Sequence, residues 1–221
     1  TTHKKRRFHN RDMGEQKKNN FEIDDLIFKE LIKRGYTKDG DKKTWNIADS
    51  KLWYLRPDQA QAYLDLEQSK VYHEDVIQKE VDLINQEIQS IIARVKGDSM
   101  NIIDLGCGDG SKAKLFIEML KGNVKLRYCP IDISNYMVDK ALTNVRKTYV
   151  EEVVKLQWNI SDFENVENIS HLLRYGGYNK NFFLLLGNTL GNFEINELLY
   201  EIRSAMKGDD YLLIGNGLDN R

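Results

Sequence analysis

The segment Asn101-Ile-Ile-Asp-Leu-Gly-Cys-Gly-Asp-Gly110 constrains the fold more than any other part of the chain. A short apolar stretch ends in an acid and is followed by glycine at every second position. Glycine has no Cβ, so a backbone of this kind turns sharply and approaches a ligand closely. The next residues, Ser111–Leu120, carry apolar side chains at helical spacing. A strand, a glycine loop and a helix in this order predict a nucleotide-sized cradle at the carboxyl end of a parallel strand.

The spacing of these glycines distinguishes two kinds of cofactor loop. A dinucleotide fingerprint needs glycine at its first, third and sixth positions, the last for close packing of helix on strand. Counted from Gly106, the sixth position is Ser111, and Gly110 occupies the fifth. The loop therefore favours the acid-x-Gly-x-Gly-x-Gly pattern of S-adenosylmethionine (SAM)-dependent methyltransferases over that of a nicotinamide oxidoreductase. A tight glycine turn that binds no ligand is the structural alternative.

Beyond the glycine loop, apolar and amphipathic stretches alternate. Strands are predicted over Leu126–Ile133, Val153–Ile160, Phe182–Leu186 and from Tyr211 onward, and helices over Ser134–Lys147, Glu164–Arg174 and Glu194–Met206. Such alternation implies parallel strands joined by helical crossovers. We therefore predict an α/β, Rossmann-like fold, with a mostly parallel sheet and helices on both of its faces.

Candidate ligand contacts follow the ends of these strands. Asp132 is placed to accept hydrogen bonds from both ribose hydroxyls of a nucleoside. Asp162 can accept from an adenine amino group while the Phe163 ring packs on the base. Alternatively, Asp162 caps the following helix and Phe163 fills the core. The fourth strand, Phe182–Leu186, runs into Gly187-Asn-Thr-Leu-Gly-Asn-Phe193, an unusual loop rich in glycine and amides.

Four blocks of the sequence together resemble the histidine-specific methyltransferase family. The blocks are Asp104–Lys112, Cys129–Ser134, Asp162-Phe163 and Leu186–Asn192. Their order and spacing match that family from about Tyr54 to the end of the chain. The family includes the enzyme that trimethylates the α-amine of histidine in ergothioneine biosynthesis. The resemblance implies a class I methyltransferase fold, SAM as methyl donor and S-adenosylhomocysteine (SAH) as product.

The resemblance also implies roles for individual residues. Gly106 and Lys112 resemble residues at the methionine end of SAM, Asp132 the ribose acid, and Asp162 with Phe163 the adenine contacts. Further cofactor contacts are predicted at Asp104, Gly108, Gly110, Ser134, Gly187, Asn188 and Thr189. Three of these residues have alternative readings. In the alternative, Lys112 is a solvated helix residue, and the side chains of Asn188 and Thr189 only form hydrogen bonds with the backbone of their own loop.

The substrate side of the site is predicted from three residues. Asn192 resembles the family's substrate-contacting asparagine, and Tyr54 and Tyr72 sit where the family has aromatic clusters that line the amino-acid pocket. We predict Asn192, Tyr72 and Tyr54 as the catalytic group. No metal is predicted, because the spacing of Cys107 and Cys129 does not suit a metal site. A catalytic role for Cys107 is a remote alternative.

Three regions are predicted along the chain. Residues 1–20 are predicted to form a disordered basic tail. This tail is either simply solvated or serves in nuclear import or RNA tethering. Residues 21–72 form an appendage, with a helix over Asp24–Arg34, a hairpin signalled by Asp39-Gly40 and a helix that begins at Pro57. Residues 73–221 form the SAM-binding domain, which opens with an amphipathic helix over His73–Val95.

The two ends of the chain point to a fragment. The chain begins with Thr1 rather than methionine and stops at Arg221, just after its fifth predicted strand. The family continues into further strands that help to hold the substrate. We therefore expect the domain to lack its C-terminal strands.

Composition excludes several classes of protein. The formal net charge of -1 argues against a general binder of nucleic acid or membranes. No stretch approaches the roughly 20 apolar residues of a membrane span, and no signal peptide is visible. Two cysteines in 221 residues suit a reducing compartment, so a cytoplasmic location is predicted. The oligomeric state is left open.

The predicted function is transfer of a methyl group from SAM to the amine of a histidine-like amino acid or a related small molecule. One rival is an RNA or protein methyltransferase guided by the basic tail, which would bind nucleic acid in a salt-sensitive manner. A second rival is a non-catalytic SAM-binding subunit. A nicotinamide oxidoreductase is the most distant alternative.

Overall fold

The computed structural model describes residues 32, 35–45, 54, 56–146, 148, 152–153 and 165–217. The chain divides into two compact units, Thr1–Leu52 and Trp53–Arg221. The predicted tail, most of the helix predicted over residues 24–34, and Asp162 with Phe163 lie outside the described residues. The predicted division of the chain at residues 20 and 72 stays a prediction.

The described part of the first unit contains a β-hairpin. Strands β1 (Tyr36–Asp39) and β2 (Lys42–Trp45) pair antiparallel, and Asp39 lies opposite Lys42. The turn is therefore Gly40-Asp41, one residue later than the predicted Asp39-Gly40. Gly40 has a φ of 57°, the positive angle that a glycine supplies at the first position of a tight hairpin turn.

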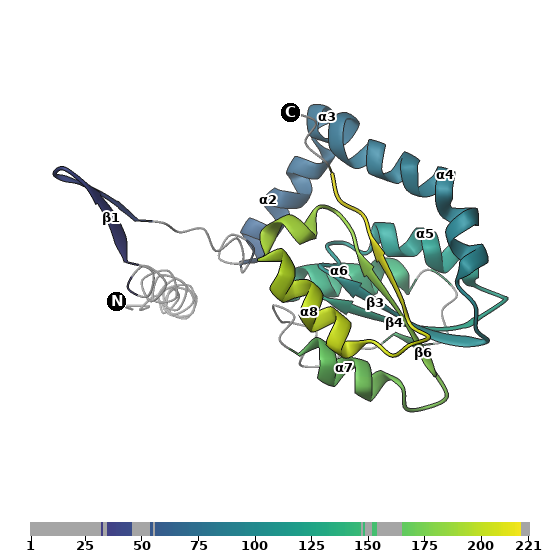
Figure 1. The fold of residues 1–221 in the computed structure, drawn as a ribbon. Helices are drawn as coiled ribbons and strands as arrows, with labels where there is room; N and C mark the ends of the chain where they lie inside the picture. Colours follow the sequence, from purple (N-terminus) through teal and green to yellow (C-terminus); the bar gives the residue numbers. More distant parts are fainter. Residues whose placement is uncertain are drawn as a thin grey trace, which may run out of the picture. The chain divides into compact units, whose positions relative to one another are not determined.

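The second unit is built on a parallel sheet (Figure 1). Its five strands run in the order β5-β4-β3-β6-β7, and each neighbouring pair is parallel. The strands are β3 (Ser99–Leu105), β4 (Lys125–Ile131), β5 (Glu152–Val153), β6 (Lys180–Leu185) and β7 (Tyr211–Ile214). The chain adds strands on one side of β3 and then returns to add β6 and β7 on the other. The loops after β3, β4 and β6 therefore meet at a topological switch point, where open α/β sheets bind ligands.

Helices cover both faces of this sheet, which confirms the predicted fold class (Figure 1). The helices α4 (Gln78–Arg94), α5 (Ser111–Leu120) and α6 (Asn135–Val145) lie on one face, and α7 (Val166–Leu173) and α8 (Ile195–Ala205) on the other. Alternate residues of a strand point to opposite faces. Ile102 accordingly joins the core beneath α4, α5 and α6, whereas Ile103 joins the core beneath α7 and α8.

The long helix predicted over His73–Val95 is present but is not uniform. It continues from α3 (Lys70–Tyr72) through a π-helical segment, η2 (His73–Ile77), into α4. A π segment carries an extra residue per turn and often marks a functional site. Hydrophobic spacing alone does not reveal such a segment, because the stripe of Ile84 and Ile88 resumes beyond it and packs on the sheet.

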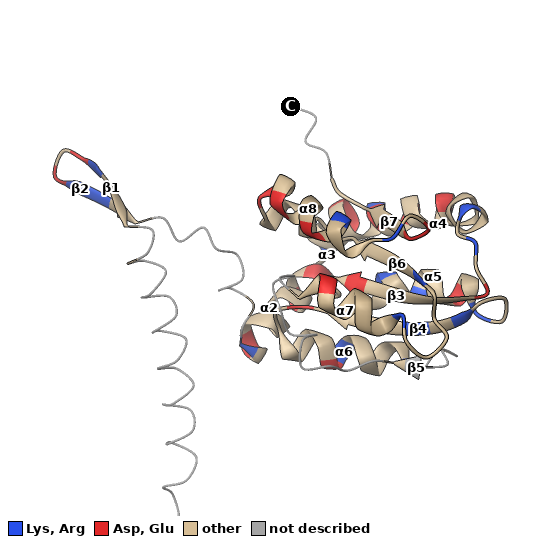
Figure 2. Ribbon diagram, turned by 60° about the horizontal axis from the view of Figure 1, so that its bottom comes forward, with Lys and Arg blue, Asp and Glu red and all other residues tan. Residues whose placement is uncertain are grey.

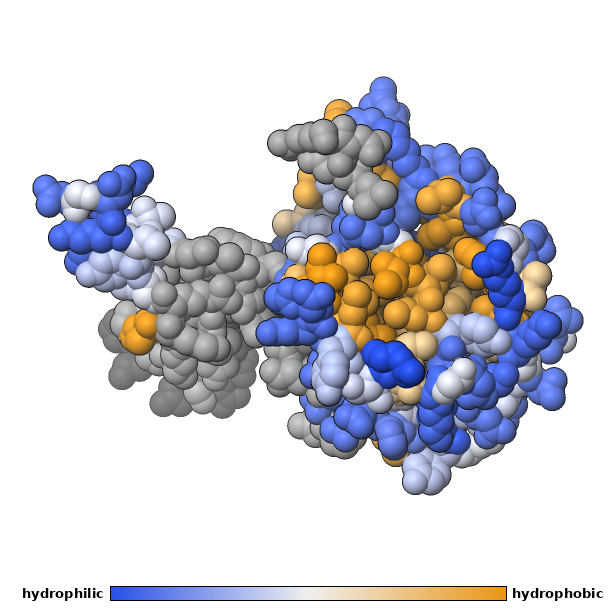
Figure 3. All heavy atoms as spheres, in the orientation of Figure 1, coloured by the Kyte–Doolittle hydropathy of each residue, from blue (hydrophilic) through white to orange (hydrophobic). Residues whose placement is uncertain are grey.

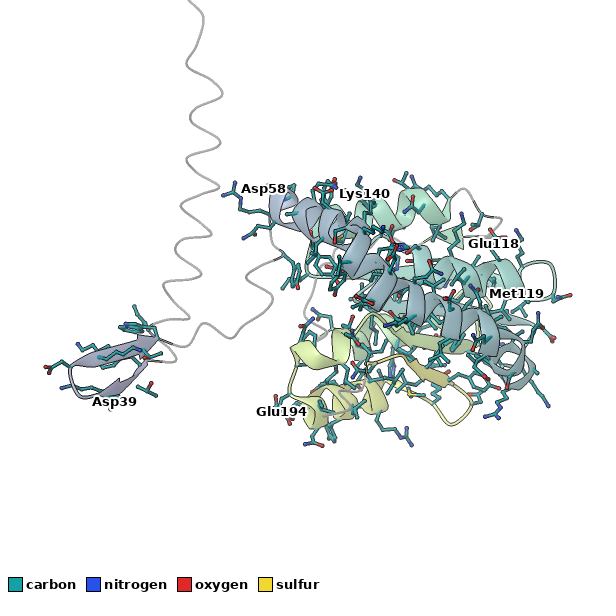
Figure 4. All side chains as sticks on the ribbon, turned by 90° about the horizontal axis from the view of Figure 1, so that it is seen from above. Asp39, Asp58, Glu118, Met119, Lys140 and Glu194 are labelled. Atoms are coloured by element: carbon teal, nitrogen blue, oxygen red, sulfur yellow. The ribbon has the colours of Figure 1, made fainter. Side chains whose placement is uncertain are left out.

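Helix α2 (Pro57–Gln68) begins at the predicted proline. Ala60 and Leu64 are buried and pack against Met137 of α6. Figure 4 shows the two helices side by side and labels Asp58 at the start of α2 and Lys140 on α6. This packing attaches α2 to the sheet unit, beside the carboxyl end of β4.

Several predicted bounds differ from the structure at their ends. β4 stops at Ile131 rather than Ile133, because the Asp132 carboxylate accepts from the Ser134 backbone N–H and turns the chain. The helix predicted from Glu194 begins one residue later, because Glu194 is its N-cap and accepts from the Glu197 N–H at 2.9 Å (Figure 4). Of the third predicted strand, Val153–Ile160, only Val153 lies among the described residues, as the second residue of β5 (Glu152–Val153).

An apolar surface lies over β7 at the edge of the sheet (Figure 3). Ile214 is 40% exposed there, and Tyr211, Leu212 and Leu213 are partly buried. None of the described helices combines the length and apolar character that crossing a membrane requires.

Candidate active site

Asp132 ties the loop after β4 to the glycine loop after β3. Its Oδ2 accepts from the Gly108 N–H at 3.2 Å, and its Oδ1 accepts from the Ser134 N–H at 2.9 Å. A carboxylate has about four lone-pair positions, so acceptor capacity is left for a ligand's hydroxyl groups. Burial raises the pKa of Asp132 to about 6, although the backbone N–H groups act in the opposite direction. The group is therefore ionised at neutral pH.

The glycine loop is fixed by contacts on both of its sides. Gly106 and Cys107 donate to the Ile131 carbonyl at 2.8 and 3.1 Å. Gly106 has a φ of 69°, and a Cβ there would lie 2.6 Å from Cγ2 of Thr189. The protein's own packing therefore requires glycine at position 106.

The other two glycines of the loop differ in what they face. A Cβ on Gly110 would lie 3.0 Å from Ala141 of α6, so this glycine lets the loop pack against that helix. A Cβ on Gly108 would meet no atom within 4 Å. Gly108 is therefore the position of the loop that leaves open space in which a ligand can approach the backbone.

Asp104 lies beneath the loop rather than at its surface. It is 3% exposed, and its Oδ2 accepts from the Tyr128 hydroxyl at 2.8 Å. Burial raises the pKa of Asp104 to about 7, and the hydrogen bond from Tyr128 counteracts part of that effect. The predicted contact between Asp104 and a cofactor stays a prediction.

The loop after β6 reaches the glycine loop through Thr189. Thr189 begins a short 3-10 helix, η4 (Thr189–Asn192), and its hydroxyl donates to the Leu186 carbonyl at 2.7 Å. Asn188 has a φ of 60°, and its Oδ1 accepts from the Gly217 N–H at 2.5 Å. Both side chains thus bond to backbone groups. Asn192 ends η4 with an exposed side chain.

Lys112 is largely covered and paired, so it is not a solvated helix residue. Its Nζ lies 2.7 Å from Oε2 of Glu80, and the two side chains are 15% and 17% exposed. The other oxygen of Glu80 accepts from the Gly187 N–H at 2.8 Å. Glu80 therefore links α4, α5 and the loop after β6. Sequence reasoning missed Glu80, because it occupies a polar position of an amphipathic helix, where a glutamate is ordinary.

Three tyrosines and a carboxylate lie close together, and one of them, Tyr54, reaches Asp132. The rings of Tyr54 and Tyr63 pack edge to face with centroids 5.3 Å apart. The pKa of Tyr54 is raised, first by burial and then by the neighbouring Tyr72, Asp132 and Glu67. The structure thus brings the predicted Tyr54 close to both Tyr72 and Asp132. Tyr63 and Glu67 were not predicted, although their separation by four residues places them on one side of a helix.

The carboxyl edge of the sheet is acidic (Figure 2). The carboxylates that interact there come from the loops after β3 and β4 and from helices α2 and α4, and they are Asp104, Asp109, Asp132, Glu67 and Glu80. Among the described residues, no group of three or more His, Cys, Asp or Glu side chains is arranged to hold a metal ion. Cys107 is buried and its pKa is raised by burial, which keeps the thiol protonated and unreactive.

The family model described as "Histidine-specific methyltransferase, SAM-dependent" matches residues 68–221. The chain belongs to this family. No curated protein sequence matches the chain. The family assignment agrees with the resemblance that the four sequence blocks carry.

Solved structures of other methyltransferases are similar to this chain. The plantazolicin methyltransferase BpumL in complex with a triazolic desmethylPZN analog and SAH gives a TM-score of 0.40 at 17% identity, over 85% of this chain and 57% of that one. BpumL with SAH gives 0.40 at 18%, over 84% and 58%. A SAM-dependent methyltransferase from Aquifex aeolicus gives 0.35 at 17%, over 59% and 66%. The chain thus spans a little over half of BpumL.

The described residues fit SAM, the methyl donor of the histidine-specific family. Asp132 retains acceptor capacity, and open space lies over the backbone at Gly108. Acidic residues outnumber Lys112 around that space, and an acidic environment suits a sulfonium cation. Residues that hold an adenine are predicted at Asp162 and Phe163, outside the described residues.

Proposed function

We propose that this chain binds SAM over its glycine loop and transfers the methyl group to the amine of a histidine-like amino acid or a related small molecule. The observation that carries the proposal is the position of Asp132. Two backbone N–H groups fix its carboxylate at the end of β4, and Tyr54, which also interacts with Tyr72, lies close enough to interact with it. A nucleoside on Asp132 would therefore have an aromatic pocket next to it.

The cofactor side of the site has a defined role for each group. Asp132 would accept from the ribose hydroxyls, and Gly108 would let the ligand approach the loop backbone. Lys112 would face the methionine end, where its pairing with Glu80 at 2.7 Å fixes the position of its ammonium group. Bound SAM supplies an electrophilic methyl group on a good leaving group.

The chain itself must align the acceptor and exclude water. The acceptor has to present a neutral amine, because an ammonium has no lone pair. Tyr54 and Tyr72 would line the pocket, and the amide of Asn192 would orient the acceptor from η4. Several contacts to the acceptor would hold its amine in line with the methyl group, in a near-attack geometry.

Incubation of the protein with SAM and a panel of amino acids, followed by mass spectrometry of the products, tests the proposal. Product that carries one to three added methyl groups supports it. Asp132→Ala should abolish product, whereas Asp82→Ala, which changes an exposed acid of α4, should not. Tight SAM binding with no methylated amine would instead indicate a non-catalytic SAM-binding subunit and would overturn the proposed reaction.

A further inference from the structure

Glu67 of α2 lies close to the proposed cofactor-binding residues, but none of the roles proposed for them involves it. Pro57 begins α2, and the buried Ala60 and Leu64 fasten the helix to α6. Tyr63 and Glu67 lie one helical turn apart, and a hydrogen bond joins their side chains. Glu67 is half-buried. The rigid attachment of α2 therefore presents a hydrogen-bonded carboxylate at a fixed place.

The surroundings of Glu67 are those of the acceptor pocket. Its carboxylate interacts with Tyr63 and Tyr54, whose rings pack edge to face, and Tyr72 interacts with both tyrosines. Tyr54 also lies close enough to Asp132 for that carboxylate to raise its pKa. Glu67 is thus the carboxylate that interacts with these two tyrosines, and Tyr54 connects it to Asp132.

The charges around Glu67 do not balance without a ligand. Lys112, Asp109 and Glu80 are the further charged groups that act on Glu67. Glu80 is already engaged, because it pairs with Lys112 at 2.7 Å and accepts from Gly187 at 2.8 Å. Glu67 brings a second carboxylate to the same lysine. A cationic group of the substrate would supply a second positive charge beside these carboxylates.

Burial gives this carboxylate the character of a base. The pKa of Glu67 is raised by burial, against the opposing effects of Lys112 and the Tyr63 hydrogen bond. A carboxylate with a raised pKa holds a transferred proton better than an exposed one. The aromatic faces of the three tyrosines would favour an ammonium group in the same space.

We propose that Glu67 is a catalytic residue that binds the substrate ammonium and accepts its proton, and that Tyr63 is the positioning residue that orients it. The inference rests on the proposed function. The ammonium R–NH3⁺ gives one proton to the Glu67 carboxylate, which becomes a neutral carboxyl group. The amine lone pair then forms the N–C bond to the methyl group as the C–S bond breaks, and the bonding electron pair of the C–S bond stays on sulfur. Glu67 then releases its proton to solvent, after which the methylated ammonium that forms can lose a further proton by the same route.

The test compares Glu67→Gln with the matched control Asp65→Asn, an exposed acid on the same helix. SAM affinity is measured by calorimetry, and kcat/KM for the best substrate of the amino-acid panel is measured as a function of pH. We expect both variants to bind SAM like the wild type. Glu67→Gln should lose on the order of 10²-fold in kcat/KM at neutral pH. The loss should shrink as the pH rises toward the pKa of the free amine, because solvent then removes the proton.

Two further variants separate catalysis from folding. Glu67→Asp keeps a carboxylate and should retain part of the rate. Tyr63→Phe keeps the ring but removes the hydrogen bond that favours the ionised carboxylate, so the acid limb of the wild-type pH profile should move to higher pH. These variants also decide the question if Glu67→Gln fails to fold.

Each outcome bears on a different claim. Absence of SAM binding by the folded wild type refutes the proposed function, and the role of Glu67 with it. SAM binding without any methylated amine refutes an amine acceptor and therefore a proton acceptor for it. Methylation with normal SAM binding, but with Glu67→Gln within about threefold of the wild type at every pH, refutes the role of Glu67 alone. A loss that is the same at every pH assigns Glu67 a structural role and also contradicts the proposal.

Discussion

Thr189 fills the space that a side chain at Gly106 would need: its Cγ2 lies 2.6 Å from the position of a Cβ there. The contact joins the loop after β6 to the glycine loop after β3. The glycine loop and the loop that contains Thr189 therefore pack directly against each other. A substitution in one loop should change the energetic effect of a substitution in the other.

Gly106→Ala should therefore destabilise the fold. The added methyl group collides with Thr189, and the positive φ of 69° is strained for alanine. We expect a loss of about 1–3 kcal/mol in the free energy of unfolding. Denaturant unfolding measures it, and in the background of Thr189→Ala the same substitution should cost less.

Gly108→Ala is the matched comparison within the same loop. Its Cβ meets no atom within 4 Å, so packing adds nothing to the strain of its φ of 51°. The methyl group would instead occupy the open space over the loop. We expect the free energy of SAM binding to weaken by more than the free energy of unfolding decreases. If Gly108→Ala binds SAM like the wild type, the ligand does not approach the loop there.

The ion pair of Lys112 and Glu80 should contribute to stability because it is mostly covered. Glu80→Ala removes the partner of a largely buried ammonium and of the Gly187 N–H, and it should cost about 1–3 kcal/mol. Asp75→Ala breaks an exposed pair with Lys79, whose side chains are 66% and 70% exposed, and should cost almost nothing. Equal losses in thermal or denaturant unfolding would contradict this difference.

The buried Asp104 should make stability depend on pH. The folded chain binds its proton with a pKa of about 7, whereas the ordinary value is 3.8. Between these values the folded state holds more protons than the unfolded state, so its stability falls as the pH rises. Relative to Asp104→Asn, which stays neutral, the wild type should lose free energy of unfolding from about pH 4 to pH 7 and change little above.

Tyr128→Phe gives the converse check. The Tyr128 hydroxyl donates to Asp104 at 2.8 Å and favours the ionised carboxylate. Without it the pKa of Asp104 should rise further, and the loss of stability should extend to higher pH. A stability difference that does not vary with pH would show that Asp104 does not titrate in this interval.

Local signals were enough to predict the elements around the glycine loop. The helix predicted over Ser111–Leu120 has those bounds, and α2 begins at Pro57, because a glycine loop and a proline in a first turn are local features. The hairpin turn falls one residue from its prediction, since Asp39 pairs with Lys42. Asp-Gly as a pair marks a turn but does not fix which residues lie outside the strands.

Contacts between distant segments could not be predicted from the sequence. Glu80 reaches the Gly187 N–H across 107 residues of chain, and nothing in an amphipathic stripe distinguishes it from a solvated glutamate. Tyr63 and Glu67 lie on α2, and the packing of α2 against α6 that places them is a contact between distant segments. Conversely, the parallel sheet could be predicted, since the alternation of strands and helices restricts the possible connections.

Calorimetric titration of SAH into the wild type, Asp132→Ala and Asn192→Ala tests the central claim most directly. Asp132 is predicted to grip the nucleoside and Asn192 to orient the acceptor. The wild type and Asn192→Ala should therefore bind SAH alike, although Asn192→Ala should lose turnover, and Asp132→Ala should show no binding. Equal loss of affinity in the two variants, or no binding by the folded wild type, would contradict the claim.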